Sequence, residues 1–128
     1  MAKTKNERLT EKLFEDFLKT QGIVEENGWK LEYQKSENPK LSFTSKTGKG
    51  NIGAPEFIIT RKGCSNFAIV VEAKASVEKL VKIAKNKISL AQTNIGPYAV
   101  NGAYHYALDI VNDFNVLFIG CAGDESDF

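Results

Sequence analysis

Residues 67–74, with the sequence FAIVVEAK, constrain the fold more than any other part of the chain, because apolar side chains occupy six of the eight positions. A strand with one face in water alternates apolar and polar side chains, whereas an almost continuously apolar strand is covered on both faces. We therefore expect this segment to lie in the centre of a sheet, with other elements packed against each face.

The remaining elements follow from periodicity and turn residues. Apolar residues at helical spacing predict helices over residues 5–21, 76–87 and 98–111. Short apolar and aromatic stretches predict strands over residues 29–33, 57–60 and 116–121. The Gly-containing turn at residues 61–66 joins the 57–60 strand to the central strand as an antiparallel hairpin. Residues 35–54 lack periodicity, and we expect no regular element there. Together these elements predict an α/β sandwich around a mixed β-sheet.

Length and composition narrow the class of protein. The chain has 128 residues, of which 42% are hydrophobic and 26% charged, as in one ordinary globular domain. A membrane span needs about 20 consecutive apolar residues, and the apolar runs here are far shorter. The charged N-terminus predicts no secretory signal, and the two cysteines lack metal-site spacing. We expect a cytoplasmic protein with no membrane partner, folded as a single domain over residues 1–128.

The net charge of +1 hides an uneven distribution. Residues 51–90 contain seven Lys or Arg and three Glu, whereas residues 91–128 contain five acidic residues and no Lys or Arg. A locally basic segment is a candidate surface for an anionic partner, although lysines that merely solvate a helix face are the commoner case. The charge pattern alone does not choose between these two interpretations.

Two carboxylates are expected to meet at one end of the predicted hairpin. Glu56 precedes the first hairpin strand and Glu72 lies near the end of the second, so antiparallel pairing brings them together. Lys74 follows Glu72 by two positions and therefore points to the same face. Charges beside buried apolar surface are costly unless they are paired or bind a cation, and two carboxylates suit Mg²⁺. The alternative is a solvent-exposed Glu72–Lys74 ion pair with Glu56 in a turn.

The segments GAPEFII (residues 53–59) and IVVEAK (residues 69–74) resemble the signature of the PD-(D/E)XK nucleases: a Pro-acid pair, a hairpin and an acid-x-Lys exit. The later segment YAVNGAYHYA (residues 98–107) is similar to the N-terminal nuclease domains of restriction enzymes that also carry methyltransferase or translocase parts. The resemblance implies a restriction-endonuclease-like α/β/α sandwich. Because the chain stops soon after its last predicted strand, we expect either a small stand-alone protein or the N-terminal fragment of a longer restriction enzyme, and favour the second.

The resemblance also implies an activity, hydrolysis of DNA phosphodiesters by a Mg²⁺-dependent endonuclease in which Mn²⁺ can substitute. Glu56 and Glu72 would bind the metal, Ala73 would contribute its carbonyl oxygen, and Lys74 would position the attacking water. Double-stranded DNA would be the substrate, and a methyltransferase, specificity or translocase domain or subunit would be the partner. The family more often has Asp where this chain has Glu56, and the extra methylene moves the carboxylate.

Further site residues follow from the same resemblance. The first helix of the family often supplies a Glu, for which Glu11 is the candidate and Glu7 and Glu15 are rivals. Many relatives carry a Gln-x-x-x-Tyr pair on the helix after the acid-x-Lys strand. In this chain Asn101 and His105 share one face of that helix, and both are candidates for contact with the site or with DNA. For a lone His, a packed or surface role is the commoner one.

Phosphate contacts would come from lysines in the 45–50 loop and in the predicted 76–87 helix, and they supply affinity without sequence information. These candidates are Lys46, Lys49, Lys79, Lys82, Lys85 and Lys87. Two other functions stay open. One is a catalytically silent DNA-binding or assembly module on the same fold, which Glu56 in place of Asp favours. The other is an unrelated α/β protein in which the Glu-Ala-Lys sequence is coincidental.

Overall fold

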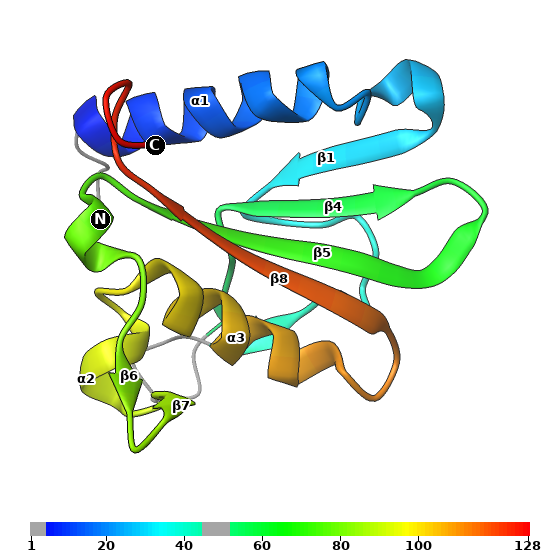
Figure 1. Cartoon of the computed structure of the whole chain (residues 1–128). Helices are drawn as coiled ribbons and strands as arrows, with labels where there is room; N and C mark the ends of the chain where they lie inside the picture. Colours follow the sequence, from blue (N-terminus) through cyan, green and yellow to red (C-terminus); the bar gives the residue numbers. More distant parts are fainter. Residues whose placement is uncertain (1–4, 45–51) are drawn as a thin grey trace.

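The computed structural model describes residues 5–44 and 52–128 (Figure 1). Its helices are α1 (Lys5–Thr20), α2 (Gln92–Ile95) and α3 (Ala99–Ile110), with short 3₁₀ turns η1 (Glu25–Asn27) and η2 (Val77–Lys79). Its strands are β1 (Trp29–Tyr33), β2 (Phe43–Thr44), β3 (Ile52–Gly53), β4 (Phe57–Arg61), β5 (Cys64–Lys74), β6 (Ile83–Ala84), β7 (Lys87–Ile88) and β8 (Asn115–Ala122). The helices predicted over 5–21 and 98–111 and the four predicted strands are confirmed.

A mixed sheet of four strands, in the order β1-β4-β5-β8, forms the centre of the fold. β5 pairs antiparallel with β4 and parallel with β8, so the apolar 67–74 segment lies between two neighbours as predicted. None of residues 68–73 is more than 5% exposed. The structure is therefore a mixed α/β fold whose most buried strand carries the acid-x-Lys sequence at its end.

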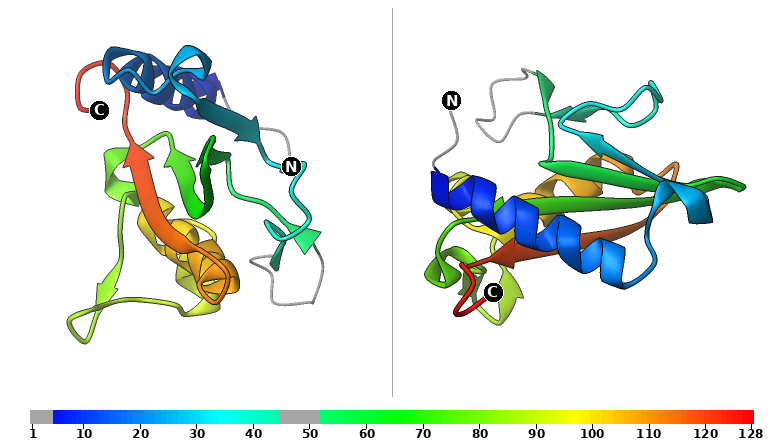
Figure 2. Two further views of the ribbon diagram at one scale, coloured as in Figure 1. Left: turned by 90° about the vertical axis from the view of Figure 1, so that its right-hand side faces the viewer. Right: turned by 90° about the horizontal axis from the view of Figure 1, so that it is seen from above.

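The helices α1 and α3 cover opposite faces of this sheet, as the two views of Figure 2 show. Phe14 and Leu18 of α1 pack against Val71 on one face. Tyr106 and Ile110 of α3 pack against the other face. Successive β5 side chains alternate between these two layers because the side-chain period of a strand is two residues. This alternation decides which side chains of the β5 terminus share a face.

The turn of the β4–β5 hairpin is tighter than predicted. Arg61 pairs with Cys64, which leaves only Lys62 and Gly63 to connect the strands, with a bulge between Ile59 and Arg61. Gly63 has φ of 85°, a left-handed conformation that glycine adopts without the steric cost of a Cβ. The predicted 61–66 turn is thus largely replaced by strand, and the hairpin reaches farther from the core.

The helix predicted over residues 76–87 is wrong. This segment contains the 3₁₀ turn η2 and the two-stranded β6–β7 hairpin instead. Ser76 caps η2 by accepting a hydrogen bond from the Glu78 N–H, so a start signal was present but the helix did not continue. The segment contains three exposed β-branched residues, Val77, Val81 and Ile83. Such side chains favour extended backbone, and a helix here would gain no stability from packing against the core.

Residues 35–54 contain a short ribbon that the sequence did not predict. Phe43 and Thr44 of β2 pair with β3, and Phe43 packs edge-on against Tyr106 of α3 at a ring-centroid distance of 5.5 Å. Elsewhere, the buried Thr10 hydroxyl donates to the Gly123 carbonyl at 2.7 Å, which ties α1 to the end of β8. In the described residues, no helix combines the length and the apolar character that a membrane crossing requires.

Candidate functional site

Glu56 and Glu72 lie side by side at the end of the sheet where β4 begins and β5 ends. Phe57 pairs with Val71 in the β4–β5 ladder, so the two glutamates occupy the next cross-strand position. The backbone N–H of Glu56 donates a hydrogen bond to Glu72 Oε1, at an N···O distance of 2.9 Å. The expectation that the hairpin brings these residues together is confirmed.

Glu72 and Lys74 share the sheet face that α3 covers. Val70 packs in the cluster of α3, whereas Val71 and Ala73 pack in the cluster of α1. By strand alternation, positions 72 and 74 then continue the face of Val70. Glu72 is 1% exposed and Lys74 is half-buried, so the carboxylate lies inside the protein and the lysine lies at its margin.

Two glycines allow close packing of α3 beside Glu72 and β8. A Cβ added at Gly102 of α3 would lie 3.2 Å from Glu72 Oε2 and 2.8 Å from the Ile95 carbonyl oxygen. Gly120 of β8 is the register partner of Glu72, and a Cβ there would meet the backbone of Val100 at 2.5 Å. The missing side chain at Gly102 therefore lets α3 approach Glu72, and the missing side chain at Gly120 lets α3 approach β8.

Replacing Gly102 with Ala is expected to destabilise the protein by about 1–3 kcal/mol, because the added methyl forces the backbone or the Glu72 carboxylate to move. Urea unfolding measures this loss. Gly96→Ala is the matched control, since a Cβ at Gly96 meets no atom within 4 Å. Equal stability of Gly102→Ala and Gly96→Ala would show that Gly102 does not define the space around Glu72.

Glu11 of α1 contributes a third carboxylate to the electrostatics of this region. Burial raises the pKa of the Cys121 thiol to about 12, and the charges of Glu72, Glu11 and Glu56 add to the rise in that order. The Cys121 thiol also donates to the Glu72 carbonyl at 3.6 Å. Glu11 is 9% exposed, and its charge therefore acts on a group that the two strand carboxylates also affect.

The rival glutamates of α1 have different surroundings. Glu15 accepts a hydrogen bond from the Tyr33 hydroxyl at 2.9 Å. Burial raises the pKa of Tyr33 to about 12, and the bond to Glu15 and the charges of Glu15 and Glu11 follow as causes. Glu7 is half-buried in the first turn of α1. Of the three, Glu11 is the one whose charge acts on both Tyr33 and Cys121.

Gln34 contacts the acid pair and was missed from the sequence. Its side-chain Nε2 lies 3.5 Å from Glu56 Oε2, and its backbone N–H donates to the Glu56 carbonyl at 3.3 Å. Gln34 has φ of 61°, an uncommon conformation for a residue other than glycine. No local pattern marks this residue, because only the pairing of β1 with β4 brings it to Glu56.

Tyr106 of α3 forms part of the wall around Glu72. It is 3% exposed, and its pKa is raised chiefly by burial and next by the charge of Glu72, while a backbone hydrogen bond from Ala54 opposes the rise. The ring of His105 lies 5.3 Å from that of Tyr106, and His105 is half-buried. A DNA contact of His105 stays a prediction.

Asn101 of α3 is a buried polar residue whose side chain hydrogen-bonds to the backbone of a neighbouring segment. It is 0% exposed, and its Oδ1 accepts from the Lys82 N–H at 2.8 Å. Its Nδ2 donates to the carbonyls of Lys82 and Ser89, at 2.9 and 2.8 Å. The carboxamide thus hydrogen-bonds to the backbone of the segment between η2 and α2, and a contact of Asn101 with the site or with DNA stays a prediction.

The candidate phosphate-binding lysines fall into two groups. Lys46 and Lys49 lie outside the described residues. Lys79, Lys82, Lys85 and Lys87 are exposed along η2 and the β6–β7 hairpin. The ammonium of Lys79 lies 5.2 Å from the centre of the Tyr98 ring, a cation–π distance that holds η2 against the start of α3.

The donor set suits a hard cation but is small. Carboxylate and backbone carbonyl oxygens are the ligands that Mg²⁺ takes, and Mg²⁺ usually keeps several waters. Ala73 is 2% exposed, and its side chain packs in the cluster of α1. Within residues 5–44 and 52–128, no group of three or more His, Cys, Asp or Glu side chains is arranged to hold a metal ion. The acid pair fits a metal that takes the rest of its shell from water and substrate.

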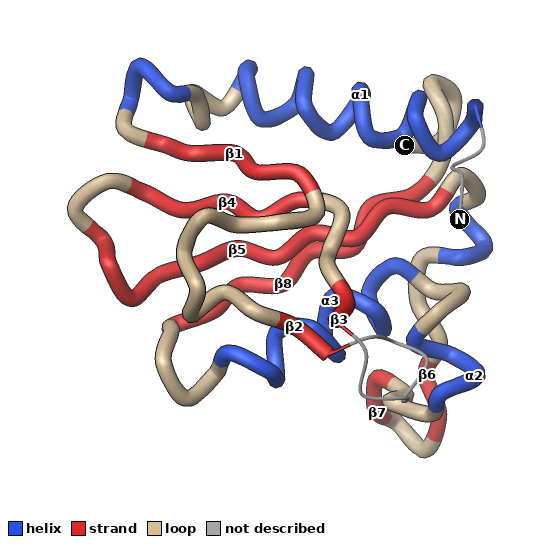
Figure 3. Tube along the Cα trace, turned by 180° about the vertical axis from the view of Figure 1, so that it is seen from behind, coloured by secondary structure: helices blue, strands red, loops and turns tan. Residues whose placement is uncertain are grey.

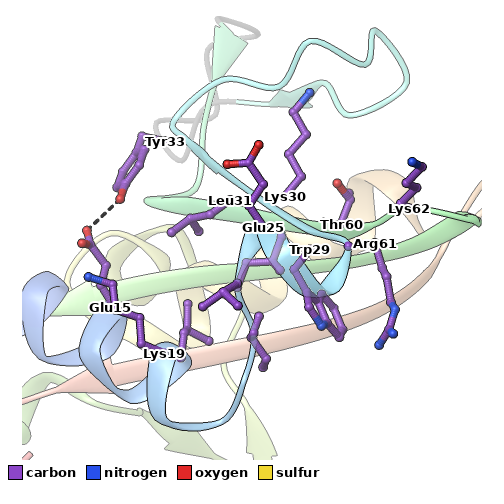
Figure 4. Close-up of a pocket in the computed structure, with 15 residues that line it drawn as sticks. Glu15, Lys19, Glu25, Trp29, Lys30, Leu31, Tyr33, Thr60, Arg61 and Lys62 are labelled. Atoms are coloured by element: carbon purple, nitrogen blue, oxygen red, sulfur yellow. Dashed lines mark hydrogen bonds between the residues drawn. The ribbon is translucent and has the colours of Figure 1, made fainter.

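A separate groove of about 910 Å³ lies between the second half of α1 and strand β1 (Figure 4). Arg61 stacks over the Trp29 ring at 4.9 Å within it, and Leu18 and Ile59 add apolar lining. None of Glu56, Glu72 and Lys74 lines this groove. The acid pair and this groove therefore lie in different parts of the molecule.

Comparison with known proteins finds one informative similarity. Over 122 residues the chain is 34% identical to the type II restriction enzyme and methyltransferase RM.BcgI of Heyndrickxia coagulans. The aligned segment covers 90% of this chain but only 18% of that protein. No family model matches the chain, and no solved structure matches it.

Proposed function

We propose that the protein is the DNA-cleaving part of a restriction-modification system, acting as a Mg²⁺-dependent endonuclease. The observation that carries the proposal is the cross-strand pair of Glu56 and Glu72, joined by the 2.9 Å contact of the Glu56 N–H with Glu72 Oε1. Lys74 completes the acid-x-Lys sequence on the same sheet face. The similarity to a protein named as both restriction enzyme and methyltransferase supports the assignment to this kind of system.

The proposed site resembles that of the PD-(D/E)XK nucleases on a restriction-endonuclease-like fold. Glu56 and Glu72 would hold Mg²⁺, or Mn²⁺ in its place, with the Ala73 carbonyl as a third donor. When bound, the metal would supply Lewis acidity and lower the pKa of the attacking water. The burial of Glu72 strengthens its attraction for a cation, because charges interact more strongly away from bulk water.

The side chains around the acid pair have distinct proposed roles. Lys74 would orient the attacking water and the phosphate from the margin of the site. Gln34 would hold the Glu56 carboxylate through its Nε2 group, which lies 3.5 Å away. Glu11 would add negative charge from the α1 side and strengthen the demand for a cation. The roles of Lys74 and Glu11 follow from their charges, and the role of Gln34 follows from its hydrogen bond to Glu56.

The proposed partners are double-stranded DNA and a methyltransferase, specificity or translocase domain or subunit. The curated relative carries both named activities in one chain, and this chain corresponds to 18% of its length. Site recognition would then belong to other parts of such an enzyme. Contacts of this chain with DNA would mainly be with phosphates, which position the duplex without reading its sequence.

The test is nicking of supercoiled plasmid by the protein with Mg²⁺ or Mn²⁺, with and without EDTA. We expect open circles and linear DNA in the presence of either metal and none with EDTA. A second candidate, a silent DNA-binding module on the same fold, is favoured by the small number of metal-binding side chains in the described residues. DNA binding without metal-dependent nicking would support that second function and overturn the first.

A further inference from the structure

The β6–β7 hairpin is largely exposed. Every residue from 81 to 87 is exposed, and in the described residues the two strands pair only with each other. Figures 1 and 3 show the hairpin projecting at the end of the molecule where β5 ends. An isolated two-stranded hairpin is at best marginally stable in water, so its conformation needs support from outside the ribbon.

That support comes from its turn and from α3. Lys85 and Asn86 both have positive φ, 53° and 62°, as the two central residues of a type I′ hairpin turn require. At the base of the hairpin, Asn101 makes three hydrogen bonds of 2.8–2.9 Å with the backbone of Lys82 and Ser89. A fully buried side chain of the helix therefore closes the base of the hairpin.

The same turn of α3 also contacts the acid pair. Gly102 follows Asn101 directly, and a Cβ at Gly102 would lie 3.2 Å from Glu72 Oε2. Val100, on the other side of Asn101, donates its N–H to the Leu80 carbonyl at 2.8 Å. Three consecutive helix residues thus hold η2, the hairpin base and the surroundings of Glu72 in one arrangement.

The charge of this segment points to an anionic partner. Residues 74–90 contain five lysines and a single acidic residue, Glu78. The major groove of B-DNA, which is about 12 Å wide, admits a two-stranded β-ribbon. Lys82, which directly precedes β6, and Lys87 of β7 are both exposed, so they can reach the phosphates that border the groove.

We propose that the β6–β7 hairpin is a finger that enters the major groove of duplex DNA and holds it beside Glu56 and Glu72. This inference rests on the proposed endonuclease function. Lys82 and Lys87 bind backbone phosphates, and the tip formed by Lys85 and Asn86 faces the base edges. Asn101 is a positioning residue that fixes the finger relative to the acid pair.

The first test is a salt series of DNA affinity, measured by fluorescence anisotropy on two unrelated duplexes. Lys82→Glu/Lys87→Glu is expected to flatten the slope of log K against log salt by about two, since each lost phosphate contact removes about 0.9. Lys19→Glu/Lys62→Glu is the matched control, because it changes the net charge equally at the other end of the sheet. An unchanged slope in the hairpin variant would overturn the proposal.

The second test is photo-crosslinking from the hairpin tip. Cys64 is exposed at the far end of the β4–β5 hairpin, and Cys121 is buried with a raised thiol pKa, so a thiol-reactive probe labels the wild type at Cys64. Asn86→Cys with Cys64→Ser moves the probe to the tip. We expect crosslinks to duplex DNA from position 86 and none from position 64; the reverse pattern would overturn the proposal.

Groove choice is tested with the same duplexes. Netropsin, which fills the minor groove, is expected to leave binding unchanged, whereas a duplex whose major groove is filled by glucosylated 5-hydroxymethylcytosine should bind weakly. The opposite result would overturn the major-groove assignment. If the wild type binds and nicks DNA and the hairpin variants do the same, the proposed role of the hairpin is wrong, whereas the proposed endonuclease function is supported. If the wild type neither binds nor nicks DNA, both fail.

Discussion

Replacing Glu72 with Gln is expected to abolish metal-dependent plasmid nicking and to leave the protein folded. The amide oxygen of Gln can still accept the hydrogen bond that the Glu56 N–H now donates to Glu72 Oε1 at 2.9 Å. The substitution removes the negative charge that would bind the cation. Nicking assays with Mg²⁺ and Mn²⁺, together with urea unfolding, measure the two effects separately.

Two further variants control for this result. Glu72→Ala also removes the acceptor of the part-buried Glu56 N–H, and an unsatisfied buried donor costs about 1–3 kcal/mol at most, so this variant should unfold at lower urea than Glu72→Gln. Glu26→Gln neutralises an exposed carboxylate of η1 and should nick DNA like the wild type. Nicking by Glu72→Gln at the wild-type rate would remove Glu72 from the proposed chemistry.

Lys74→Met is expected to stop nicking with little change in DNA affinity. Methionine keeps an unbranched apolar stem at this half-buried position but lacks the positively charged ammonium group that would orient water or phosphate. Loss of one lysine changes the salt slope of binding by at most about 0.9, so the other lysines should maintain the complex. Single-turnover nicking at saturating protein, with anisotropy on the same duplex, separates rate from binding.

Lys62→Met is the control for lysine loss, since Lys62 lies in the turn at the opposite end of β4 and β5. It should nick DNA normally. If Lys74→Met instead lost affinity and kept its turnover per bound complex, Lys74 would be a phosphate anchor. Its proposed role in orienting the attacking water would then be wrong.

The parts of the fold that the sequence predicted depend on local patterns or on hairpin geometry. The apolar run of residues 67–74 required cover on both faces, and α1 and α3 provide it. The meeting of Glu56 and Glu72 follows from one tight turn, because an antiparallel hairpin places the start of its first strand beside the end of its second. Neither inference needed information about distant parts of the chain.

The parts that were missed depend on long-range contacts. Residues 76–87 have apolar side chains at helical spacing, but no core face covers them, and the Asn101 amide holds their backbone as the base of a hairpin. Gln34 reaches Glu56 only through the pairing of β1 with β4. The need for glycine at position 102 arises from the Ile95 carbonyl oxygen and from the carboxylate of Glu72, thirty residues earlier. The spacing of residues along the sequence does not predict such long-range contacts.

Mn²⁺ binding to the wild type, Glu56→Gln, Glu72→Gln and the double variant tests most directly whether the two carboxylates form one metal site. Electron paramagnetic resonance of free Mn²⁺ gives the affinity and the number of ions bound. If both carboxylates hold the same ion, the wild type binds one ion at this site, each single variant weakens it, and the two losses in free energy are not additive. Undiminished Mn²⁺ binding by the double variant, or strictly additive losses, would contradict a shared site.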